Sequence, residues 1–299
     1  MAEVILIDGS MGQEIVNRSG QEPTGLWSTK VMREQPEIVE AVHADYIDAG
    51  AKVIGTNTYG LLRDRLVAAG IEPEFEALHK LGCEIAAKAR GEHDAAIAGC
   101  MGPMGWSYRP DMAPKAELAA PYYSEIAELQ KPYVDLFMIE TMCSVDQSRG
   151  ALMGACGHDV PVWLCLSVDE NDGTLLRSGE PLEDIAPLLE EFDVEAALLN
   201  CSPPEAIDAG LPVLEEMGLT CGAYANGFTK ITPEFAQAGA NVGALSARTD
   251  LGPEAYADFG LGWVDMGARI VGGCCEVGPE HIKVLRSRLI AAGHTVRGI

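Results

Sequence analysis

The chain has 299 residues, of which 47% are hydrophobic, and a formal net charge of −24 at pH 7. This length allows one large core, and the acidic surface would repel a nucleic-acid backbone, so we do not expect nucleic-acid binding. No apolar run approaches the roughly 20 residues of a membrane span, and no signal peptide is recognisable. We therefore expect a cytoplasmic protein with no membrane partner, in which the nine cysteines are core thiols, metal ligands or catalytic groups.

Short apolar runs alternate with longer segments of helical periodicity along the whole chain. The runs predict eight strands, at residues 4–7, 52–56, 95–100, 136–141, 160–168, 196–200, 220–225 and 268–272. Among the intervening helices, two are predicted at 36–49, between Pro36 and Gly50, and at 279–292. Eight alternations favour a single (β/α)8 TIM barrel, formed by residues 1–299 as one α/β domain, over an open doubly wound sheet.

Each predicted strand ends in residues that can donate, accept or ligate. The first strand ends in Asp8-Gly9, the second in Thr56-Asn57-Thr58-Tyr59 and the fourth in Glu140-Thr141. The sixth ends in Asn200-Cys201 and the eighth in Gly272-Gly273-Cys274-Cys275. Because the C-terminal ends of barrel strands meet at one mouth, we expect these residues to line one site. Residues 101–120 are irregular and are expected to form a long loop over that mouth, with a role that the sequence leaves open.

The two adjacent cysteines are the most specific of these signals. Neighbouring side chains in a strand point to opposite faces, so Cys274 and Cys275 can reach one metal only if the backbone bends there. The preceding glycines are expected to supply the torsional freedom for that bend. A third thiolate from Cys201 would leave one position of a tetrahedral Zn²⁺ open, as in a catalytic site. A redox pair and buried core thiols are the alternative interpretations of Cys274 and Cys275.

Three thiolate ligands also indicate the kind of chemistry. Hydrolytic zinc sites favour histidine and carboxylate ligands, which leave the metal acidic enough to ionise water. Thiolates donate more charge, and such a zinc suits a substrate thiol that must be held as a thiolate and stay nucleophilic. A free thiol has a pKa of about 8.5, so little of it is ionised at neutral pH without help.

Together these residues resemble the zinc-dependent homocysteine S-methyltransferases. The segments that carry the resemblance follow the family order over nearly the whole chain: residues 8–14, 26–28, 43–51, 56–59, 102–103, 140–141, 200–201 and 272–275. Most are weak singly, but the three cysteines together with Asp8 and Glu140 are specific.

The resemblance implies a (β/α)8 barrel with Zn²⁺ bound by Cys201, Cys274 and Cys275. It implies homocysteine as the acceptor of a methyl group from a sulfonium or ammonium donor, with methionine as the product. S-Methylmethionine is the favoured donor, ahead of S-adenosylmethionine, betaine and dimethylsulfoniopropionate. No catalytic residue is expected beyond the zinc-bound substrate thiolate.

The resemblance also implies substrate contacts. Asp8 and Glu140 would hold the amino group of homocysteine, and the backbone N–H groups of the turn from Gly9 to Gly12, which includes Ser10, would hold its carboxylate. Asn57 is a further substrate-binding candidate. Aromatic candidates for contact with a cationic donor are Trp27, Tyr59, Trp106 and Tyr108.

The chain departs from the family pattern at Ser10, Gln13 and Ala225 and in the loop at 104–114, which leaves the donor open. Two alternatives stay open: an enzyme acting on another thiol or a selenol, or a zinc- or thiol-dependent barrel lyase. A non-catalytic subunit that binds a methyl carrier is a third.

Overall fold

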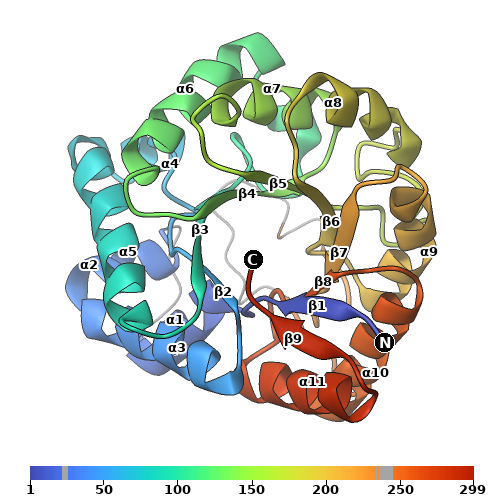
Figure 1. Ribbon diagram of the computed structural model, residues 1–299. Helices are drawn as coiled ribbons and strands as arrows, with labels where there is room; N and C mark the ends of the chain where they lie inside the picture. The colour runs from blue at the N-terminus through green and yellow to red at the C-terminus, as the bar shows by residue number, and fades with distance from the viewer. Residues whose placement is uncertain (22–25, 233–234, 236–244) are drawn as a thin grey trace.

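The computed structural model describes residues 1–21, 26–232, 235 and 245–299. Within them, one parallel sheet of nine strands runs in the order β2-β3-β4-β5-β6-β7-β8-β1-β9. The sheet is strongly curled, and the helices lie around its outside (Figure 1). The strands are β1 Glu3–Leu6, β2 Val53–Gly55, β3 Ala96–Met101, β4 Leu136–Met142, β5 Val162–Leu166, β6 Ala196–Asn200, β7 Thr220–Tyr224, β8 Ile270–Val271 and β9 Thr295–Arg297.

Helices connect the strands and cover the outer face of the sheet. They are α1 Met11–Ser19, α2 Ser28–Glu34, α3 Pro36–Ala49, α4 Arg63–Ala68, α5 Phe75–Arg90, α6 Ala116–Gln130, α7 Val145–Ala155, α8 Ala186–Glu191, α9 Pro204–Glu215, α10 Pro253–Asp265 and α11 Pro279–Ala291. The prediction for residues 36–49 is confirmed: Pro36 is the first residue of α3, and Gly50 follows with φ 105°. At that φ a glycine costs little, and its N–H donates to the carbonyls of Ile47 and Tyr46 at the helix end.

All eight predicted strands are present, but β9 was not predicted. It has three residues, of which two are exposed, so it lacks the apolar run by which the other strands were recognised. β9 pairs with residues 3–5 of β1, from Glu3↔Thr295 to Ile5↔Arg297. The chain just after β1 meets β2, where Ile7 bridges Val53 and the Asp8 N–H donates to the Val53 carbonyl at 3.0 Å. The predicted parallel α/β architecture is therefore confirmed, with one additional strand.

Two hydrophobic cores lie on the two faces of the sheet. In β5, Trp163 and Cys165 belong to a core made of alternate strand residues with no helical member among the described residues, and this core lies on the concave side of the curled sheet. Leu164 and Leu166, which alternate with them, pack against the helices in the larger outer core. Because both faces are buried, the strands read as continuous apolar runs. Polar residues are thereby confined to the strand ends.

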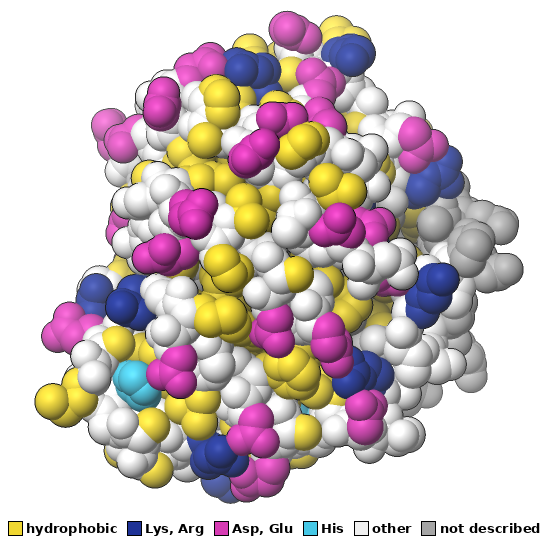
Figure 2. All heavy atoms as spheres, turned by 90° about the vertical axis from the view of Figure 1, so that its right-hand side faces the viewer, with side chains coloured by type: hydrophobic (Ala, Val, Ile, Leu, Met, Phe, Trp, Pro, Cys, Tyr) yellow, Lys and Arg dark blue, Asp and Glu magenta, His cyan; other side chains and the backbone are white. Residues whose placement is uncertain are grey.

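The acidic composition is visible on the surface. The face in Figure 2 carries many Asp and Glu side chains interspersed with fewer Lys and Arg side chains. This distribution agrees with the expectation that a polyanion is not the ligand. None of the described helices is both long enough and apolar enough to span a membrane.

Candidate active site

A single pocket collects the C-terminal ends of the strands. Every site residue predicted from the sequence lines it: Asp8, Gly9, Ser10, Asn57, Glu140, Cys201, Cys274 and Cys275. These residues lie up to 267 positions apart, between Asp8 and Cys275, and the curled sheet brings them together. The roles assigned to them remain predictions, but their convergence is a property of the fold.

Asp8 and Glu140 are the two acidic residues of this pocket. Asp8 Oδ2 accepts a hydrogen bond from the Gly55 N–H at 2.8 Å, and Glu140 Oε1 accepts one from the Tyr224 hydroxyl at 3.0 Å. Burial raises the pKa of both carboxyls, and the charge of Glu140 raises the pKa of Asp8 further. Within the described residues neither carboxylate has an ion-pair partner, so the arrangement can accept a cation.

An irregularity in β4 places Glu140 at the pocket. The pairing of β4 with β5 shifts register between Ile139 and Met142, and Glu140 and Thr141 lie within the shift. Thr141 has φ 62°, a left-handed conformation that is costly for a β-branched residue. The strand therefore bulges where it delivers its acidic side chain, as strands do beside active sites.

The three cysteines meet at the wall of the pocket formed by the ends of β6 and β8. Cys201 is buried, and its contact with Cys274 together with burial raises the pKa of Cys201 well above its usual value. The contact with Cys201 lowers the pKa of Cys274, but the contact with Cys275 and burial outweigh it, so that this pKa is raised as well. In the described part of the chain the side chains form these pairwise contacts, but no group of three is arranged as a metal site.

The two glycines before Cys274 have a different role from the one predicted. Neither has a positive φ; the left-handed residues beside the thiols are Cys201 at 49° and Glu276 at 66°. A Cβ on Gly272 would lie 2.2 Å from Ile7 Cγ1, and one on Gly273 would lie 2.1 Å from Val277 Cγ1. The glycines therefore allow close packing of β8 against β1 and the following turn, and the prediction of torsional freedom was wrong.

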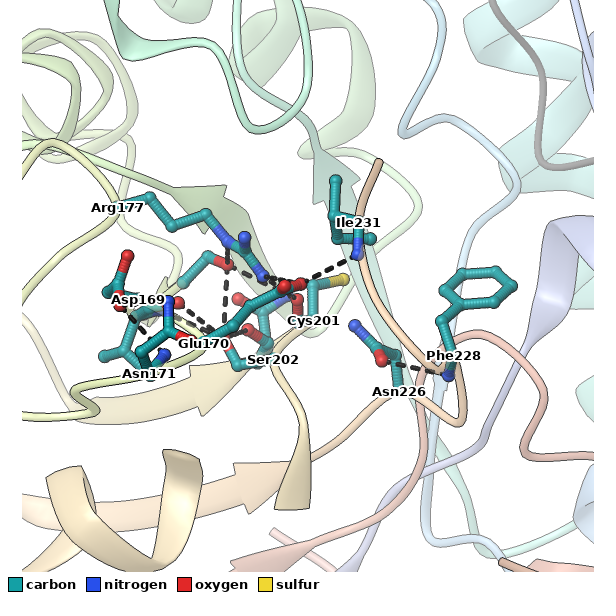
Figure 3. A network of polar contacts seen from close by, with 12 residues as sticks. Asp169, Glu170, Asn171, Arg177, Cys201, Ser202, Asn226, Phe228 and Ile231 are labelled. Carbon is teal, nitrogen blue, oxygen red and sulfur yellow. Dashed lines mark hydrogen bonds and ion pairs between the residues drawn. The ribbon is translucent and has the colours of Figure 1, made fainter. Parts of the chain in front are cut away.

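Arg177 holds the backbone at Cys201, and sequence reasoning missed it. Its Nε donates to Ser167 Oγ at 2.7 Å and its Nη2 donates to the Cys201 carbonyl at 3.2 Å. The guanidinium lies over the Tyr108 ring, 4.5 Å from its centroid. Figure 3 shows Arg177 reaching toward Cys201 from the loop after β5. Its Nη2 also lies 3.5 Å from Glu170 Oε1. No sequence motif marks this residue, because its partners are scattered along the chain and include a backbone carbonyl and a distant ring.

Asn226 follows β7 and faces the same cysteine. Its Oδ1 accepts the Phe228 N–H at 3.2 Å, whereas its Nδ2 is buried and has no hydrogen-bond partner among the described residues. Figure 3 shows that nitrogen on the side of Asn226 that faces Cys201. A buried unsatisfied amide is costly and is typical of a site that is completed by a ligand.

The turn at residues 9–12 is less open than predicted. The Ser10 N–H already donates to the Val277 carbonyl at 2.9 Å, and the Met11 N–H donates to the Gly9 carbonyl at 2.8 Å. The Ser10 side chain does not cap α1, so the amides of Gly12 and Gln13 at the first turn have no capping acceptor. These two amides at the helix N-terminus are donors suited to an anion.

Asn57 has two partners in the pocket wall. Its Oδ1 accepts a hydrogen bond from Ser28 Oγ at 2.7 Å, and its Nδ2 donates to Met32 Sδ at 3.6 Å. Its side chain therefore joins the end of β2 to α2, which suits a wall residue as well as a substrate contact.

The mouth of the pocket is aromatic. Trp27, Tyr59, Trp106 and Tyr108 all line it, as the donor hypothesis requires. The Tyr59 hydroxyl is hydrogen-bonded to Ser107 Oγ at 2.8 Å, which ties the mouth loop to the end of β2. This loop covers residues 102–115 and is shorter than the predicted 101–120, because α6 begins at Ala116. The lining also contains residues that sequence reasoning did not select, namely Arg65, Met138, Tyr224, Phe228 and Phe235.

The other cysteines separate into pocket and core. Cys100 lines the pocket. Cys83, Cys143, Cys165 and Cys221 are buried, whereas Cys156, just after α7, is half-buried and packs against the outer core.

Comparison with known proteins gives a consistent result. The family model described as "Homocysteine S-methyltransferase" matches residues 5–289. The homocysteine S-methyltransferase YbgG of Bacillus subtilis is 28% identical over 305 residues, covering 94% of this chain and 92% of that protein. The selenocysteine Se-methyltransferase of Brassica oleracea is 25% identical over 318 residues, which cover 96% of this chain and 89% of that protein.

The structural comparison extends this result to the fold. The metallated form of the homocysteine methyltransferase MmuM from Escherichia coli aligns with a TM-score of 0.80 and 27% identity, over 96% of each chain. The similarity therefore spans the sheet, its helices and all the strand ends that build the pocket.

Proposed function

The chain belongs to the homocysteine S-methyltransferase family, and from this premise we propose how its pocket transfers a methyl group to homocysteine, giving methionine. The observation that supports the proposal most strongly is the convergence of three thiols and two carboxylates in one pocket. The thiols suit a soft metal and the carboxylates suit an ammonium group. Homocysteine carries a thiol and an ammonium group, so one molecule can bind both the metal and the carboxylates.

We propose that Cys201, Cys274 and Cys275 bind Zn²⁺. Thiolate sulfur is a preferred ligand of zinc, two pairwise contacts already join the three side chains, and the unsatisfied Asn226 amide lies beside them. When bound, zinc would supply the positive charge that keeps the substrate thiol ionised at neutral pH. The match to a metallated bacterial relative supports the same assignment.

The acceptor is oriented by charges at its other end. Asp8 and Glu140 bind its ammonium group, which relieves the repulsion between the buried Asp8 and the half-buried Glu140. The amides of Gly12 and Gln13 at the start of α1 receive its carboxylate. Tyr224 keeps Glu140 in place through its hydroxyl. These contacts direct the sulfur of homocysteine toward the three cysteines.

The reaction is a displacement at the methyl carbon. A new carbon–sulfur bond to homocysteine forms as the bond from the methyl carbon to the donor sulfur or nitrogen breaks, and that electron pair leaves with the donor. The thiol proton is lost to solvent before the transfer. The aromatic mouth excludes water and holds a cationic donor against the rings of Trp27, Tyr59, Trp106 and Tyr108. S-Methylmethionine is the donor that we favour.

The test is a donor panel. The zinc-loaded protein is incubated with homocysteine and S-methylmethionine, S-adenosylmethionine, betaine or dimethylsulfoniopropionate, and methionine is measured by mass spectrometry. We expect methionine to form with S-methylmethionine. If no donor yields methionine, the proposal is refuted.

A selenol acceptor is the second candidate, because a plant relative is a selenocysteine Se-methyltransferase. The same assay with selenocysteine in place of homocysteine separates the two. A higher kcat/KM for the selenol would make it the preferred acceptor.

We also propose that residues 1–299 form one domain whose sheet closes into a (β/α)8 barrel, with β9 as an added strand. The contact of Ile7 with Val53 supports closure between β1 and β2. The nine free cysteines suit the reducing cytoplasm, which is where we propose that the enzyme acts.

A further inference from the structure

Arg65 brings a positive charge to the mouth of an otherwise acidic pocket. It belongs to α4 and lines the pocket. Its Nη2 donates to the Pro103 carbonyl at 3.2 Å, but its Nε is buried and has no hydrogen-bond partner in the described part of the chain. Such an unsatisfied donor on a charged group is costly unless a ligand completes it.

No acidic side chain of the described residues forms an ion pair with Arg65. Arg63, two positions earlier on the same helix, binds both Glu72 and Glu125. The chain contains 45 Asp and Glu residues against 21 Lys and Arg residues, so an acidic partner is readily available to an arginine. An arginine left without one inside a pocket indicates that the ligand supplies the anion.

Aromatic rings hold the guanidinium in a fixed position. Its central carbon lies 5.2 Å from the Trp106 ring centroid and 5.9 Å from that of Tyr59. The hydrogen bond from Tyr59 to Ser107 joins the two loops that carry these rings. A guanidinium held in this way keeps a rigid fork of donors that matches a carboxylate, and less entropy is lost when the carboxylate binds.

The position of Arg65 points to the donor and not to the acceptor. Trp106 and Tyr59, the two rings that lie over its guanidinium, are also two of the four rings proposed to hold the cationic donor. The ammonium of homocysteine is assigned to Asp8 and Glu140, and its carboxylate to the start of α1, so the charged groups of the acceptor already have partners. A donor whose cationic centre lies against these rings would bring its carboxylate within reach of Arg65.

We propose that Arg65 binds the carboxylate of the methyl donor and is the residue by which the enzyme selects a donor for that group. This inference rests on the proposed function. It also gives the loop at 102–115 a role, because Trp106 and the Pro103 carbonyl both contact the guanidinium.

The experiment compares an acid with its ester. The zinc-loaded enzyme is assayed with homocysteine and either S-methylmethionine or S-methylmethionine methyl ester, which has the same sulfonium without the carboxylate charge. We expect wild type to prefer the acid by about 10- to 100-fold in kcat/KM, as one charged hydrogen-bonded contact allows. Arg65→Met should abolish this preference by lowering kcat/KM for the acid alone, and Arg65→Lys should retain part of it.

Arg149→Met is the matched control, because Arg149 pairs with Glu191 at the surface and does not line the pocket. It should leave the acid-to-ester ratio unchanged. If Arg65→Met lowers kcat/KM for acid and ester equally, Arg65 only supports the loop, and the inference is overturned while the proposed function stands. If S-methylmethionine is not used, the same comparison applies to betaine and its methyl ester. If wild type uses no donor, both proposals fail together.

Discussion

Asn200 and Thr141 are joined by two reciprocal hydrogen bonds that tie the end of β6 to the end of β4. The Thr141 N–H donates to Asn200 Oδ1 at 3.1 Å, and Asn200 Nδ2 donates to Thr141 Oγ1 at 3.1 Å. Thr141 follows Glu140 and Asn200 precedes Cys201. This pair therefore sets the spacing between the carboxylate proposed to bind the ammonium and the thiol proposed to bind zinc.

The first prediction concerns this pair. Asn200→Ala removes both bonds and leaves a buried N–H of Thr141 unsatisfied, so we expect a loss of about 2–3 kcal/mol in the free energy of unfolding. We also expect a higher KM for homocysteine, since Glu140 and Cys201 lose their common support. Denaturant unfolding and steady-state kinetics would measure the two effects. Thr141→Ser keeps the hydroxyl and is the control; an equal loss in both variants would contradict the assignment.

The second prediction concerns Asp8 and pH. Its pKa is raised in the folded protein, so the folded state binds more protons than the unfolded state between the two pKa values, and stability falls as pH rises through this interval. Asp8→Asn removes the cost of burying a charged carboxylate. The amide oxygen of the new side chain can still accept a hydrogen bond from the Gly55 N–H. We expect the ligand-free variant to be more stable than wild type by about 1–2 kcal/mol at neutral pH and to bind homocysteine more weakly.

The gain from Asp8→Asn should shrink toward zero as pH falls below about 4, where Asp8 is protonated in both states. Thermal unfolding of both proteins from pH 4 to 8 without homocysteine would measure how this difference in stability depends on pH. A variant that is less stable than wild type at neutral pH would show that Asp8 is satisfied within the protein and does not await a cation.

The third prediction concerns the metal. Cys201→Ala or Cys274→Ala should lower the bound zinc after dialysis from about one equivalent per chain to nearly none and abolish methyl transfer. Elemental analysis gives the zinc content without any assay of activity. Cys156→Ser is the control, because Cys156 is partly exposed and does not line the pocket, and it should retain both properties. Full zinc content in the Cys201 and Cys274 variants would rule out their assignment as ligands.

The fourth prediction concerns Gly9. A Cβ there would lie 2.2 Å from the Val277 carbonyl oxygen and 3.0 Å from the Tyr46 hydroxyl oxygen. Gly9→Ala must therefore push the turn after Asp8 away from the turn after Cys275. We expect this to lower the free energy of unfolding by about 2–3 kcal/mol. The control variant is Gly262→Ala, because Gly262 lies inside α10 with open space around it. Its free energy of unfolding should rise by up to about 1 kcal/mol. Comparable stabilities of the two variants would contradict the tight contact at Gly9.

Much of the fold could be predicted because the parallel strands are buried on both faces. Their apolar runs stand out, as at 196–200, whose predicted limits match β6. β9 could not be predicted, since three half-exposed residues become a strand only by pairing with β1. The pocket was predictable where strand ends carry distinctive groups, such as Cys274 and Cys275.

Residues whose partners lie far away along the chain could not be predicted in the same way. Arg177 contacts the Cys201 carbonyl and the Tyr108 ring, and Arg65 contacts the Trp106 ring. The role predicted for Gly272 and Gly273 was wrong. The sequence shows that these residues are small, but it does not show which neighbouring side chain requires them to be small.

The guanidinium of Arg177 touches both ends of the pocket: the Tyr108 ring of the mouth loop and the Cys201 carbonyl of the pocket floor. A mouth loop transplanted from another family member keeps this contact only if it brings a ring to the position of Tyr108. Without such a ring, the exchange would also disturb the backbone at Cys201. Re-engineering the donor preference of this enzyme thus calls for exchanging the loop and the segment that carries Arg177 as one cassette.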